Sequence, residues 1–463
     1  MIDPKTGFID HTQIFHVLEN TLPPEESEVK EILSHALEMK GISAAETERL
    51  LMVEDEEQID AICRAANRIK TEIYGQRLVL FAPLYVSNLC RNDCLYCAFR
   101  KTNTAISRRT LNQDEIRRET ENLVSKGHKR VLLVSGEGLG ESALDYSIRA
   151  IGTIYDVKIG NGEIRRININ IAPLPVEGFR RLKDAKIGTY QLFQETYHYD
   201  TYKKMHRSGP KADYVNHLTA MDRAMEAGID DVGVGVLFGL ADYRFEIMAL
   251  LQHVHHLEER FGVGPHTISI PRIEPAEGSD VSLRPPHAVV DRDFRKIIAI
   301  LRVSVPYTGM ILSTRETAKM RREAFSLGIS QVSAGSRTNP GGYSEDDSGA
   351  QFSLGDHRSL DEVIADIAGH GYIPSFCTGC YRLGRTGADF MDLAKPGLIQ
   401  LYCLPNALTT FKEYLEDYAS AETKIAGEAL IRAQLAEIPD DEIRRKTSHN
   451  LKEIESGKRD LYL

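Results

Sequence analysis

Hydrophobic and polar positions follow a helical period in the first part of this chain. In residues 26–39 and 44–52, apolar side chains recur at spacings of three and four, and a Pro-Pro pair at 23–24 precedes the first stretch. This spacing gathers apolar side chains on one face of a helix, and proline is frequent at helix entrances. We therefore expect residues 1–75 to form a helical N-terminal extension.

From residue 78 onward, short apolar runs alternate with amphipathic stretches of helical period. The runs predict strands at residues 79–86, 130–134, 165–172, 187–193, 231–238, 267–272, 309–314 and 329–334. Helical stretches lie between most of them, for example at residues 113–126, 176–184, 214–227, 243–260 and 290–302. Eight strand–helix alternations are typical of an α/β fold of the parallel (β/α)8 TIM-barrel type. We assign residues 76–340 to this barrel.

A doubly wound sheet is the competing arrangement. Its dinucleotide-binding form carries a G-x-G-x-x-G turn, and the nearest sequence here, Gly-Glu-Gly-Leu-Gly at residues 136–140, lacks that spacing. The barrel is therefore favoured. After about residue 340 the alternation ends in a Gly- and Asp-rich stretch, residues 339–347, followed by charged helical sequence. We expect residues 341–463 to form a C-terminal domain.

The composition excludes several classes of protein. A charged fraction of 27% and a hydrophobic fraction of 42% are ordinary for a soluble protein of 463 residues. A net charge of −10, with no basic cluster, argues against nucleic acid as a partner. No apolar run reaches the roughly 18 residues of a membrane span, and the first twenty residues lack the apolar core of a signal peptide. We expect a cytoplasmic protein.

Six of the seven cysteines fall into two groups, which points to metal sites before disulfides. Cys90, Cys94 and Cys97 form the first group, with the spacing C-x3-C-x2-C. Iron–sulfur clusters are usually held by four cysteines, so three thiolates leave one iron open to another ligand. Zinc is the alternative, but zinc loops favour C-x2-C pairs completed by a distant pair. Cys63 stands alone in a helical stretch and is expected to be a buried apolar residue.

The second group has the spacing C-x2-C-x22-C and consists of Cys377, Cys380 and Cys403. It again supplies three thiolates. A zinc ribbon would need a fourth ligand, and no cysteine or histidine lies between Cys380 and Cys403. We therefore expect a second, auxiliary iron–sulfur cluster with an exchangeable ligand.

The first cysteine motif, with Tyr96 just before its last cysteine, resembles that of the radical S-adenosylmethionine (SAM) superfamily. The resemblance implies a [4Fe-4S] cluster whose open iron chelates SAM. A low-potential electron donor then reduces it, and SAM is cleaved to methionine and a 5'-deoxyadenosyl radical. Ser135, Gly136 and Glu137 stand where the superfamily has a Gly-Gly-Glu element that receives SAM, with serine replacing the first glycine.

Chemistry in such barrels lies at the carboxyl ends of the strands. Glu195 follows the fourth strand, where a carboxylate suits a ribose hydroxyl or the SAM ammonium, and a capping or surface glutamate is the alternative. Arg315 and Arg337 follow the seventh and eighth strands. Arginine there suits bidentate binding of a carboxylate, so we expect an amino-acid substrate. Each arginine could instead serve as a structural ion-pair partner.

Taken together, the first motif, residues 333–337 and residues 377–391 resemble the tyrosine lyases of [FeFe]-hydrogenase maturation, the HydG-type radical SAM enzymes. The resemblance covers essentially the whole chain, and C-x2-C-x22-C is its most specific part. It implies cleavage of the Cα–Cβ bond of L-tyrosine to p-cresol and dehydroglycine. The auxiliary cluster would convert dehydroglycine to carbon monoxide and cyanide, for an Fe(CO)x(CN) synthon used in H-cluster assembly with other hydrogenase maturation proteins.

The same resemblance assigns individual residues. The auxiliary cluster, of [4Fe-4S] or [5Fe-5S] type, would carry an extra iron bridged by a free cysteine and bound by His266. Arg315 would hold the tyrosine carboxylate, with Tyr85 and Ser333 near the amino end. Glu195 and Tyr96 would contact SAM. The family's arginine for the SAM carboxylate has no clear counterpart; His217 and Arg223 are the nearest candidates.

His266 precedes the sixth strand, so it should lie at the opposite end of the barrel from the radical site. Its alternative role is that of an ordinary loop histidine. Strands of five or six residues span roughly 17–20 Å, so a product made at one site must cross the barrel interior to reach the other. We expect a small or polar lining there, consistent with the Val-Gly-Val-Gly-Val sequence at residues 232–236.

Two other functions compete with this one. The 2-iminoacetate synthase of the thiamine thiazole pathway makes the same cleavage, but it lacks the C-x2-C-x22-C tail. A non-catalytic iron–sulfur carrier would have no SAM site, and the positions of Ser135, Gly136, Glu137 and Glu195 argue against it.

Overall fold

A computed structural model of the protein describes residues 5–344 and 349–463. Residues 345–347 of the predicted Gly- and Asp-rich stretch, and residues 1–4 of the predicted extension, lie outside the described residues. The strands of the main sheet, in chain order, are β1 (Arg77–Ser87), β2 (Arg130–Ser135), β5 (Arg166–Asn170), β6 (Tyr190–Gln191), β7 (Val232–Gly235), β8 (Thr267–Ser269), β9 (Gly309–Leu312) and β10 (Gln331–Ser333).

These eight strands, counted in the described residues, run parallel in that order, and β10 pairs with β1 to close a barrel. The predicted (β/α)8 barrel is therefore confirmed. All eight expected strands are present, but several are shorter than the apolar runs that predicted them. The chain leaves the regular ladder at the carboxyl ends, where only isolated bridges remain, such as Glu195 with Val236. Residues in these irregular ends line the cavities at the carboxyl end of the barrel.

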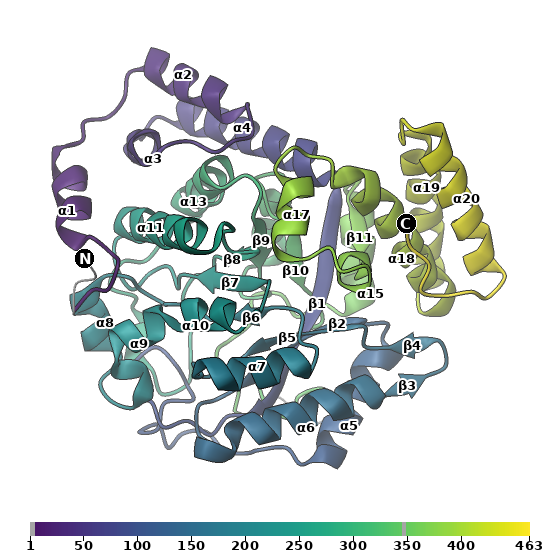
Figure 1. Ribbon diagram of the computed structural model, residues 1–463, viewed down its shortest axis with the longest axis horizontal. Helices are drawn as coiled ribbons and strands as arrows, with labels where there is room; N and C mark the ends of the chain where they lie inside the picture. Colours follow the sequence, from purple (N-terminus) through teal and green to yellow (C-terminus); the bar gives the residue numbers. More distant parts are fainter. Residues whose placement is uncertain (1–4, 345–348) are drawn as a thin grey trace.

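Helices surround the barrel as the alternating pattern predicts (Figure 1). The stretch predicted as one helix at residues 214–227 divides at Thr219 into two. The barrel helices are α5 (Gln113–Ser125), α6 (Ala143–Asp156), α7 (Val176–Asp184), α8 (Tyr199–Met205), α9 (Tyr214–Leu218), α10 (Ala220–Glu226), α11 (Tyr243–Phe261), α12 (Asp280–Leu283), α13 (Asp291–Ser304) and α14 (Ala318–Phe325), with short 3₁₀ turns at Gly140–Ser142 and Pro210–Ala212.

Helices α1 (His11–Asn20), α2 (Glu26–Ala36), α3 (Ala44–Leu51) and α4 (Glu56–Tyr74) precede the barrel. Side-chain caps define the starts of two of them: Ser43 and Glu46 form a capping box at α3, and Asp55 accepts a backbone hydrogen bond at α4. They lie over the outer side of α11 and α13 (Figure 1). Helix α4 leads directly into β1, so the extension is continuous with the barrel.

The C-terminal segment joins the barrel through a short strand. It contains α15 (Leu360–Gly369), β11 (Ile373–Ser375), α16 (Gly379–Arg382), α17 (Gly387–Ala394), α18 (Gln400–Asp417), α19 (Ala421–Ala436) and α20 (Asp441–Glu455). Strand β11 pairs in parallel with the start of β1, Arg77 opposite Ile373 and Val79 opposite Ser375. Since β1 pairs with β2 only from Ala82 onward, β11 takes the place beside β1 that β2 leaves free at the amino end of the barrel.

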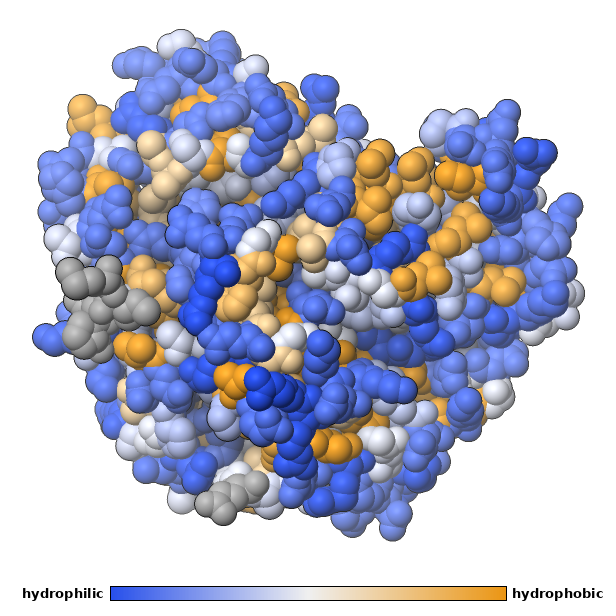
Figure 2. Space-filling model, in the orientation of Figure 1, coloured by the Kyte–Doolittle hydropathy of each residue, from blue (hydrophilic) through white to orange (hydrophobic). Residues whose placement is uncertain are grey.

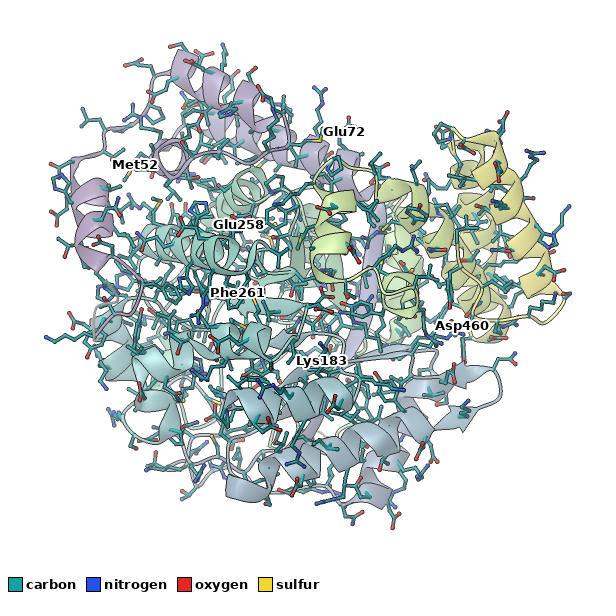
Figure 3. All side chains as sticks on the ribbon, viewed as in Figure 1. Met52, Glu72, Lys183, Glu258, Phe261 and Asp460 are labelled. Atoms are coloured by element: carbon teal, nitrogen blue, oxygen red, sulfur yellow. The ribbon has the colours of Figure 1, made fainter. Side chains whose placement is uncertain are left out.

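A buried ion cluster fastens the last helices to the barrel. Glu413 on α18 is fully buried and lies 2.8 Å from the Arg165 guanidinium and 3.2 Å from Lys129 Nζ. Its other oxygen accepts a hydrogen bond from the Asp460 backbone N–H, at 2.6 Å. Asp460 is labelled in Figure 3, where the C-terminal helices approach the hairpin formed by β3 (Lys158–Ile159) and β4 (Gly162–Glu163). One carboxylate thus neutralises two buried cations at this junction.

The face shown in Figure 2 is mainly hydrophilic, with separate apolar patches. Exposed large apolar residues include Leu383, Leu398 and Leu401 in the C-terminal segment. Within residues 5–344 and 349–463, none of the helices combines the length and apolar character needed to cross a bilayer.

We predict that Glu413→Ala destabilises the fold by about 3–5 kcal/mol, because buried Lys129 loses its ion-pair partner and Arg165 keeps only its longer contacts with Asp460 and Glu163, at 3.3 and 3.9 Å. Urea denaturation followed by circular dichroism measures the change. Glu442→Ala is the matched control on α20, since Glu442 forms only an exposed pair with Lys446 and should have no measurable effect. A loss below 1 kcal/mol for Glu413→Ala would show that the cluster does not hold the junction.

Candidate functional site

The loop that follows β1 carries Cys90, Cys94 and Cys97, and all three side chains line one cavity at the carboxyl end of the barrel. Backbone hydrogen bonds hold this loop, with Asp93 N donating to Ser208 O and Leu95 N to Met205 O, each at 3.0 Å. Burial raises the pKa of the Cys97 thiol to about 11. A buried thiolate therefore needs a bound metal to stabilise it, and three such groups around one cavity fit an iron–sulfur cluster.

The end of β2 packs against this cysteine loop. A Cβ atom on Gly136 would lie 2.4 Å from Leu89 O, so only glycine allows the approach. The Gly136 N–H donates to Ser87 O at 2.8 Å. The Glu137 carboxylate accepts from the Asn92 amide at 2.7 Å, and Ser135, Gly136 and Glu137 line the same cavity as the cysteines. The structure thus places the predicted SAM-contacting element beside the cysteine motif.

Glu195 enters the cavity from the loop after β6, with its backbone in the left-handed region at φ 68°. Its Oε1 lies 2.8 Å from Lys211 Nζ, and both side chains are largely buried. Burial alone would lower the pKa of Lys211, but the charges of Glu195, Cys94 and Glu137 outweigh it and raise that pKa. Lys211 is thus a cation that these negative charges keep protonated beside the cysteines.

The sequence did not indicate Lys211, because it belongs to no motif and lies in a short 3₁₀ turn, Pro210–Ala212. The two residues considered for the SAM carboxylate do not line this cavity. His217 is buried against Gln194, and the Arg223 guanidinium donates to backbone carbonyls including Leu174 O. Only the tertiary structure identifies Lys211 as the cation at this position.

A second cavity, of about 160 Å³, adjoins the first and shares Tyr96, Cys97, Glu195 and Gln351 with it. The Tyr96 hydroxyl is paired with His206 Nε2 at 2.9 Å, which fixes the ring.

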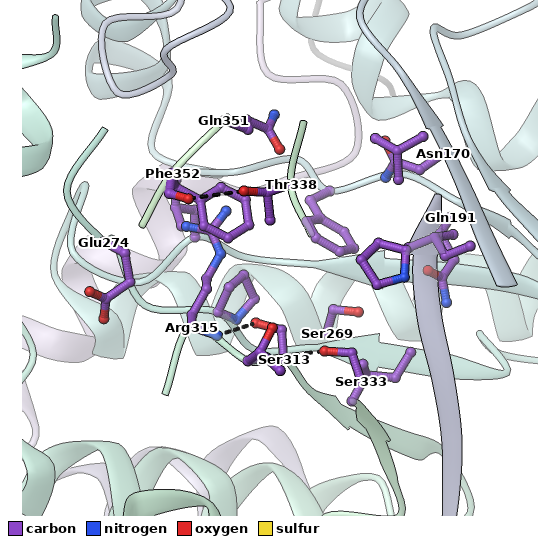
Figure 4. Close-up of a pocket in the computed structure, with 18 of the residues that line it drawn as sticks. Asn170, Gln191, Ser269, Glu274, Ser313, Arg315, Ser333, Thr338, Gln351 and Phe352 are labelled. Carbon is purple, nitrogen blue, oxygen red and sulfur yellow. Dashed lines mark hydrogen bonds between the residues drawn. The ribbon is translucent and has the colours of Figure 1, made fainter. Parts of the chain in front are cut away.

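Figure 4 shows Arg315 below Phe352 in this cavity, with Ser313 and Ser333 nearby. The Arg315 guanidinium lies 3.3 Å from the centre of the Phe352 ring. Burial lowers the pKa of Arg315, with Tyr85, Glu195 and Glu274 opposing that shift. In the part of the chain that the structure describes, Arg315 forms no ion pair, so its charge faces the cavity.

Three of the four residues predicted for the substrate meet here. Tyr85, Ser333 and Arg315 line the cavity, and Ser333 Oγ accepts from the Thr314 N–H at 3.0 Å. Arg337 does not line it; its guanidinium donates to Ser336 O at 3.0 Å. Two cavity residues carried no sequence signal. Gln351 and Phe352 come from a loop that only the fold brings to the mouth of the barrel.

The second cysteine group lies at the opposite, amino end of the barrel. Cys377 follows β11, whose pairing with the start of β1 sets its level, and Cys377, Cys380 and Cys403 line one cavity with His266. Burial raises the pKa of Cys380 to about 12, and the negative charges of Cys403 and Cys377 add to this shift. The two cysteine groups are therefore separated by the barrel, as the position of His266 before β8 predicts.

Arginine side chains surround this second cavity. Arg77, Arg130 and Arg385 line it, and the Nε atom of each is buried without a hydrogen-bond partner among the residues that the structure describes. Arg130 also donates to Cys377 O at 2.9 Å. Unpaired buried cations are costly, and an anionic cluster of thiolates would neutralise them. The residues present thus fit an iron–sulfur cluster.

Asp231 lies beside His266. His266 Nδ1 is 3.4 Å from Asp231 Oδ1, and no hydrogen bond joins them within the described residues, so Asp231 supplies a negative charge near a histidine that lines the cavity. Burial lowers the pKa of His266 to about 4, so the imidazole is neutral, as a metal ligand must be. Asp231 also accepts hydrogen bonds from the Tyr381 hydroxyl and from the Gly387 N–H. Asp231 and His266 each directly precede a strand, β7 and β8, and these strands are parallel neighbours. A prediction that β7 and β8 are adjacent would therefore have placed the two side chains close together.

The two cavities share no lining residue. Between them the barrel interior is polar, as expected, with Arg166 Nε donating to Asn168 Oδ1 at 2.8 Å and Gln191 near Thr267. The glycines of β7 do not leave open space, however. A Cβ on Gly233 would meet Thr267 and Gln191 within 3 Å, so neighbouring side chains fill the room.

For a single ion, no group of three or more Cys, His, Asp or Glu side chains converges within the described ranges. Neither cysteine group is therefore arranged around one point, which is compatible with ligands that bind separate irons of a cluster.

Comparison with known proteins agrees with this geometry. Residues 84–253 match the model of the radical SAM superfamily, and residues 269–373 match the Biotin and Thiamin Synthesis associated domain. A 2-iminoacetate synthase of Salmonella typhimurium is 31% identical over 355 residues, which cover 76% of this chain and 92% of that protein.

Two solved structures are more similar. A crystal structure of HydG, a maturase of the [FeFe]-hydrogenase, superposes with a TM-score of 0.96 at 51% identity, covering 98% of this chain and 100% of the other. HydG from Carboxydothermus hydrogenoformans superposes with a TM-score of 0.84 at 40% identity, covering 95% and 97%. Unlike the match to the synthase, these matches extend over almost the whole chain. The chain therefore belongs to the HydG family of radical SAM [FeFe]-hydrogenase maturases.

Proposed function

We propose that this protein cleaves the Cα–Cβ bond of L-tyrosine to p-cresol and dehydroglycine. Carbon monoxide and cyanide would then form at the auxiliary site, for an Fe(CO)x(CN) synthon used in [FeFe]-hydrogenase maturation. The observation that carries the proposal is the pair of three-cysteine cavities at opposite ends of one barrel. Family membership and the 51% identical HydG structure support it.

The residues at the carboxyl end of the barrel have distinct roles in this proposal. Cys90, Cys94 and Cys97 would hold a [4Fe-4S] cluster, which with SAM supplies the 5'-deoxyadenosyl radical. Lys211 would bind the SAM carboxylate, since it is the buried ammonium beside the cysteines. Glu195 would accept from the SAM ammonium or a ribose hydroxyl.

The substrate's own charges match the adjoining cavity. Arg315 would bind the tyrosine carboxylate, because its guanidinium is held on Phe352 and has no carboxylate partner within the described residues. Tyr85 and Ser333, which line the same space, would lie toward the ammonium. Glu274, whose pKa is raised mainly by burial, adds a further acidic group.

At the amino end, Cys377, Cys380 and Cys403 would hold the auxiliary cluster, and His266 would bind an extra iron bridged by a free cysteine. The unpaired arginine nitrogens support an anionic occupant of this kind. The remaining proposed partners are a low-potential electron donor and other maturation proteins.

The product assay tests the proposal. Anaerobically reconstituted protein is incubated with SAM, dithionite and L-tyrosine, and p-cresol, cyanide and carbon monoxide are measured. We expect all three from the wild type. The double variant Cys377→Ala/Cys380→Ala should retain p-cresol and lose carbon monoxide, because only the amino-end site is changed. Without carbon monoxide from protein with both clusters intact, the function would be that of a 2-iminoacetate synthase. Absence of p-cresol and of SAM cleavage would leave a cluster carrier.

Substituting Arg315 should weaken tyrosine binding. We expect Arg315→Met to lower kcat/KM for L-tyrosine by about 10- to 100-fold, since a charged hydrogen bond contributes about 1.5–3 kcal/mol. Arg322→Met is the control, because Arg322 is exposed on α14 and pairs with Asp366. The same assay on Arg337→Met decides the role of that residue; its position outside the cavity predicts a change below twofold. An unchanged kcat/KM in Arg315→Met would remove Arg315 from the substrate site.

Asp231→Asn should weaken the extra iron. The neutral amide removes the negative charge that lies 3.4 Å from His266 Nδ1, and loss of an outer partner of a metal ligand typically costs about 10- to 100-fold in metal affinity. Chelator competition and Mössbauer spectroscopy measure the iron directly, with p-cresol formation retained. Asp230→Asn is the control, since Asp230 is the exposed neighbour that accepts from Thr386. Equal iron retention in both variants would show that Asp231 does not support His266.

A further inference from the structure

Gln351 lies between the cysteine cavity and the adjoining cavity, and its side chain lines both. Figure 4 shows it at the edge of the substrate-sized cavity, next to Phe352. Its main chain is fixed on both sides, with its N–H donating to Thr338 O at 2.9 Å and its carbonyl accepting from the Ala98 N–H at 3.3 Å. The backbone position therefore does not depend on the side chain.

The side-chain amide connects a cluster ligand to a substrate-cavity residue. Gln351 Oε1 accepts a hydrogen bond from the Tyr85 hydroxyl at 2.7 Å. Gln351 Nε2 donates toward Cys97 Sγ at 3.5 Å, within reach for a sulfur acceptor. A cluster-bound Cys97 is a thiolate and can only accept. The amide nitrogen must then face the sulfur and the amide oxygen must face Tyr85.

This orientation of the amide decides that the Tyr85 hydroxyl donates its hydrogen bond to Gln351. A phenol has one proton to donate, and Tyr85 uses it on Gln351. The lone pairs of the phenol oxygen are left for the cavity, where they can accept from a donor such as the ammonium of an amino acid. Ammonium, phenol, amide and sulfur then form a chain of hydrogen bonds that all point the same way. Bonds in such a chain strengthen one another.

We propose that Gln351 couples occupancy of the substrate cavity to reduction of the SAM cluster. The inference rests on the proposed tyrosine lyase function. A donor bound at Tyr85 polarises the chain and strengthens the N–H···S bond to Cys97. Hydrogen bonds to cluster sulfurs help set the reduction potential, and this bond favours the more negative, reduced cluster. One electron enters from an external low-potential reductant; the amide proton stays on nitrogen, and no covalent bond forms or breaks.

The coupling has a functional consequence. Cleaving SAM without a substrate in place consumes SAM and leaves a radical with no intended hydrogen to abstract. Through Gln351, reduction becomes more favourable when an amino acid occupies the cavity. Losing the whole hydrogen bond to Cys97 would change the reduction equilibrium about fivefold. Strengthening it by about 10–30%, as a neighbouring bond in such a chain does, changes the equilibrium by a factor of about 1.2–1.7.

The experiment measures the reduced fraction of the SAM cluster at fixed potential by electron paramagnetic resonance, with and without L-tyrosine. S-Adenosylhomocysteine is present throughout, because it occupies the nucleoside site but has no sulfonium to cleave. The SAM-cluster signal is identified by its change on adding this analogue. In the wild-type holoprotein we expect tyrosine to raise the reduction equilibrium constant by a factor of about 1.2–1.7.

Three variants separate the two hydrogen bonds. Gln351→Met keeps the chain length but removes the N–H donor, so the equilibrium constant should fall about fivefold without tyrosine and should no longer respond to tyrosine. Tyr85→Phe keeps the donor to Cys97, so the value without tyrosine should stay within about twofold while the response is lost. Ser353→Ala, an exposed side chain in the same loop, should behave as the wild type.

A full response to tyrosine in Gln351→Met would overturn the proposal, as would no response in the wild type. Iron content and absorption spectra confirm that each variant holds its clusters. The p-cresol assay keeps the two claims apart: p-cresol from wild type without a tyrosine response refutes only the coupling, whereas absence of p-cresol refutes the lyase function itself.

Discussion

Strand β1 hydrogen-bonds to three neighbours, and both cysteine groups take their positions from it. Its middle pairs with β10 and closes the barrel, its carboxyl half pairs with β2, and its amino end pairs with β11. The strand is buried along nearly all of its eleven residues. Its carboxyl end leads into the loop of Cys90, and β11 beside its amino end leads into Cys377. The length of a single strand thus sets the separation between the two sites.

Each site places buried cations beside thiols. Lys211 lies beside the first group, and Arg77 and Arg130 lie beside the second. Buried cations are costly without anionic partners. Lys211 has one in Glu195, at 2.8 Å, whereas the buried Nε atoms of Arg77 and Arg130 have no hydrogen-bond partner among the described residues. Burial opposes ionisation of the thiols and raises the pKa of Cys97 and Cys380. The two costs cancel when thiolates bind iron. Cluster binding should therefore stabilise the fold, most of all at the amino end, where the buried arginine Nε atoms have no hydrogen-bond partner among the described residues.

The polar groups around the substrate cavity are ordered by second contacts. Arg315 stacks on the ring of Phe352, and the Tyr96 hydroxyl pairs with His206. The Tyr85 hydroxyl donates a hydrogen bond to Gln351. At the amino end, Asp231 places a negative charge 3.4 Å from His266 Nδ1. Residues that carry charge toward a ligand are thus fixed before any ligand arrives, which reduces the entropy lost on binding.

The sequence alone determined the eight barrel strands, the two cysteine groups and the family, because hydrophobic period and motif spacing are local properties of the chain. It also placed His266 opposite the radical site, since the order of strands decides which end a residue occupies. Lys211, Asp231, Gln351 and Phe352 came only from the tertiary structure. They lie in loops or before strands, far along the chain from the residues they contact, and no local spacing records such a meeting. The sequence also predicted a small or polar lining of the barrel interior, but only the fold brings the polar side chains of Gln191 and Thr267 into the space beside the glycines of β7.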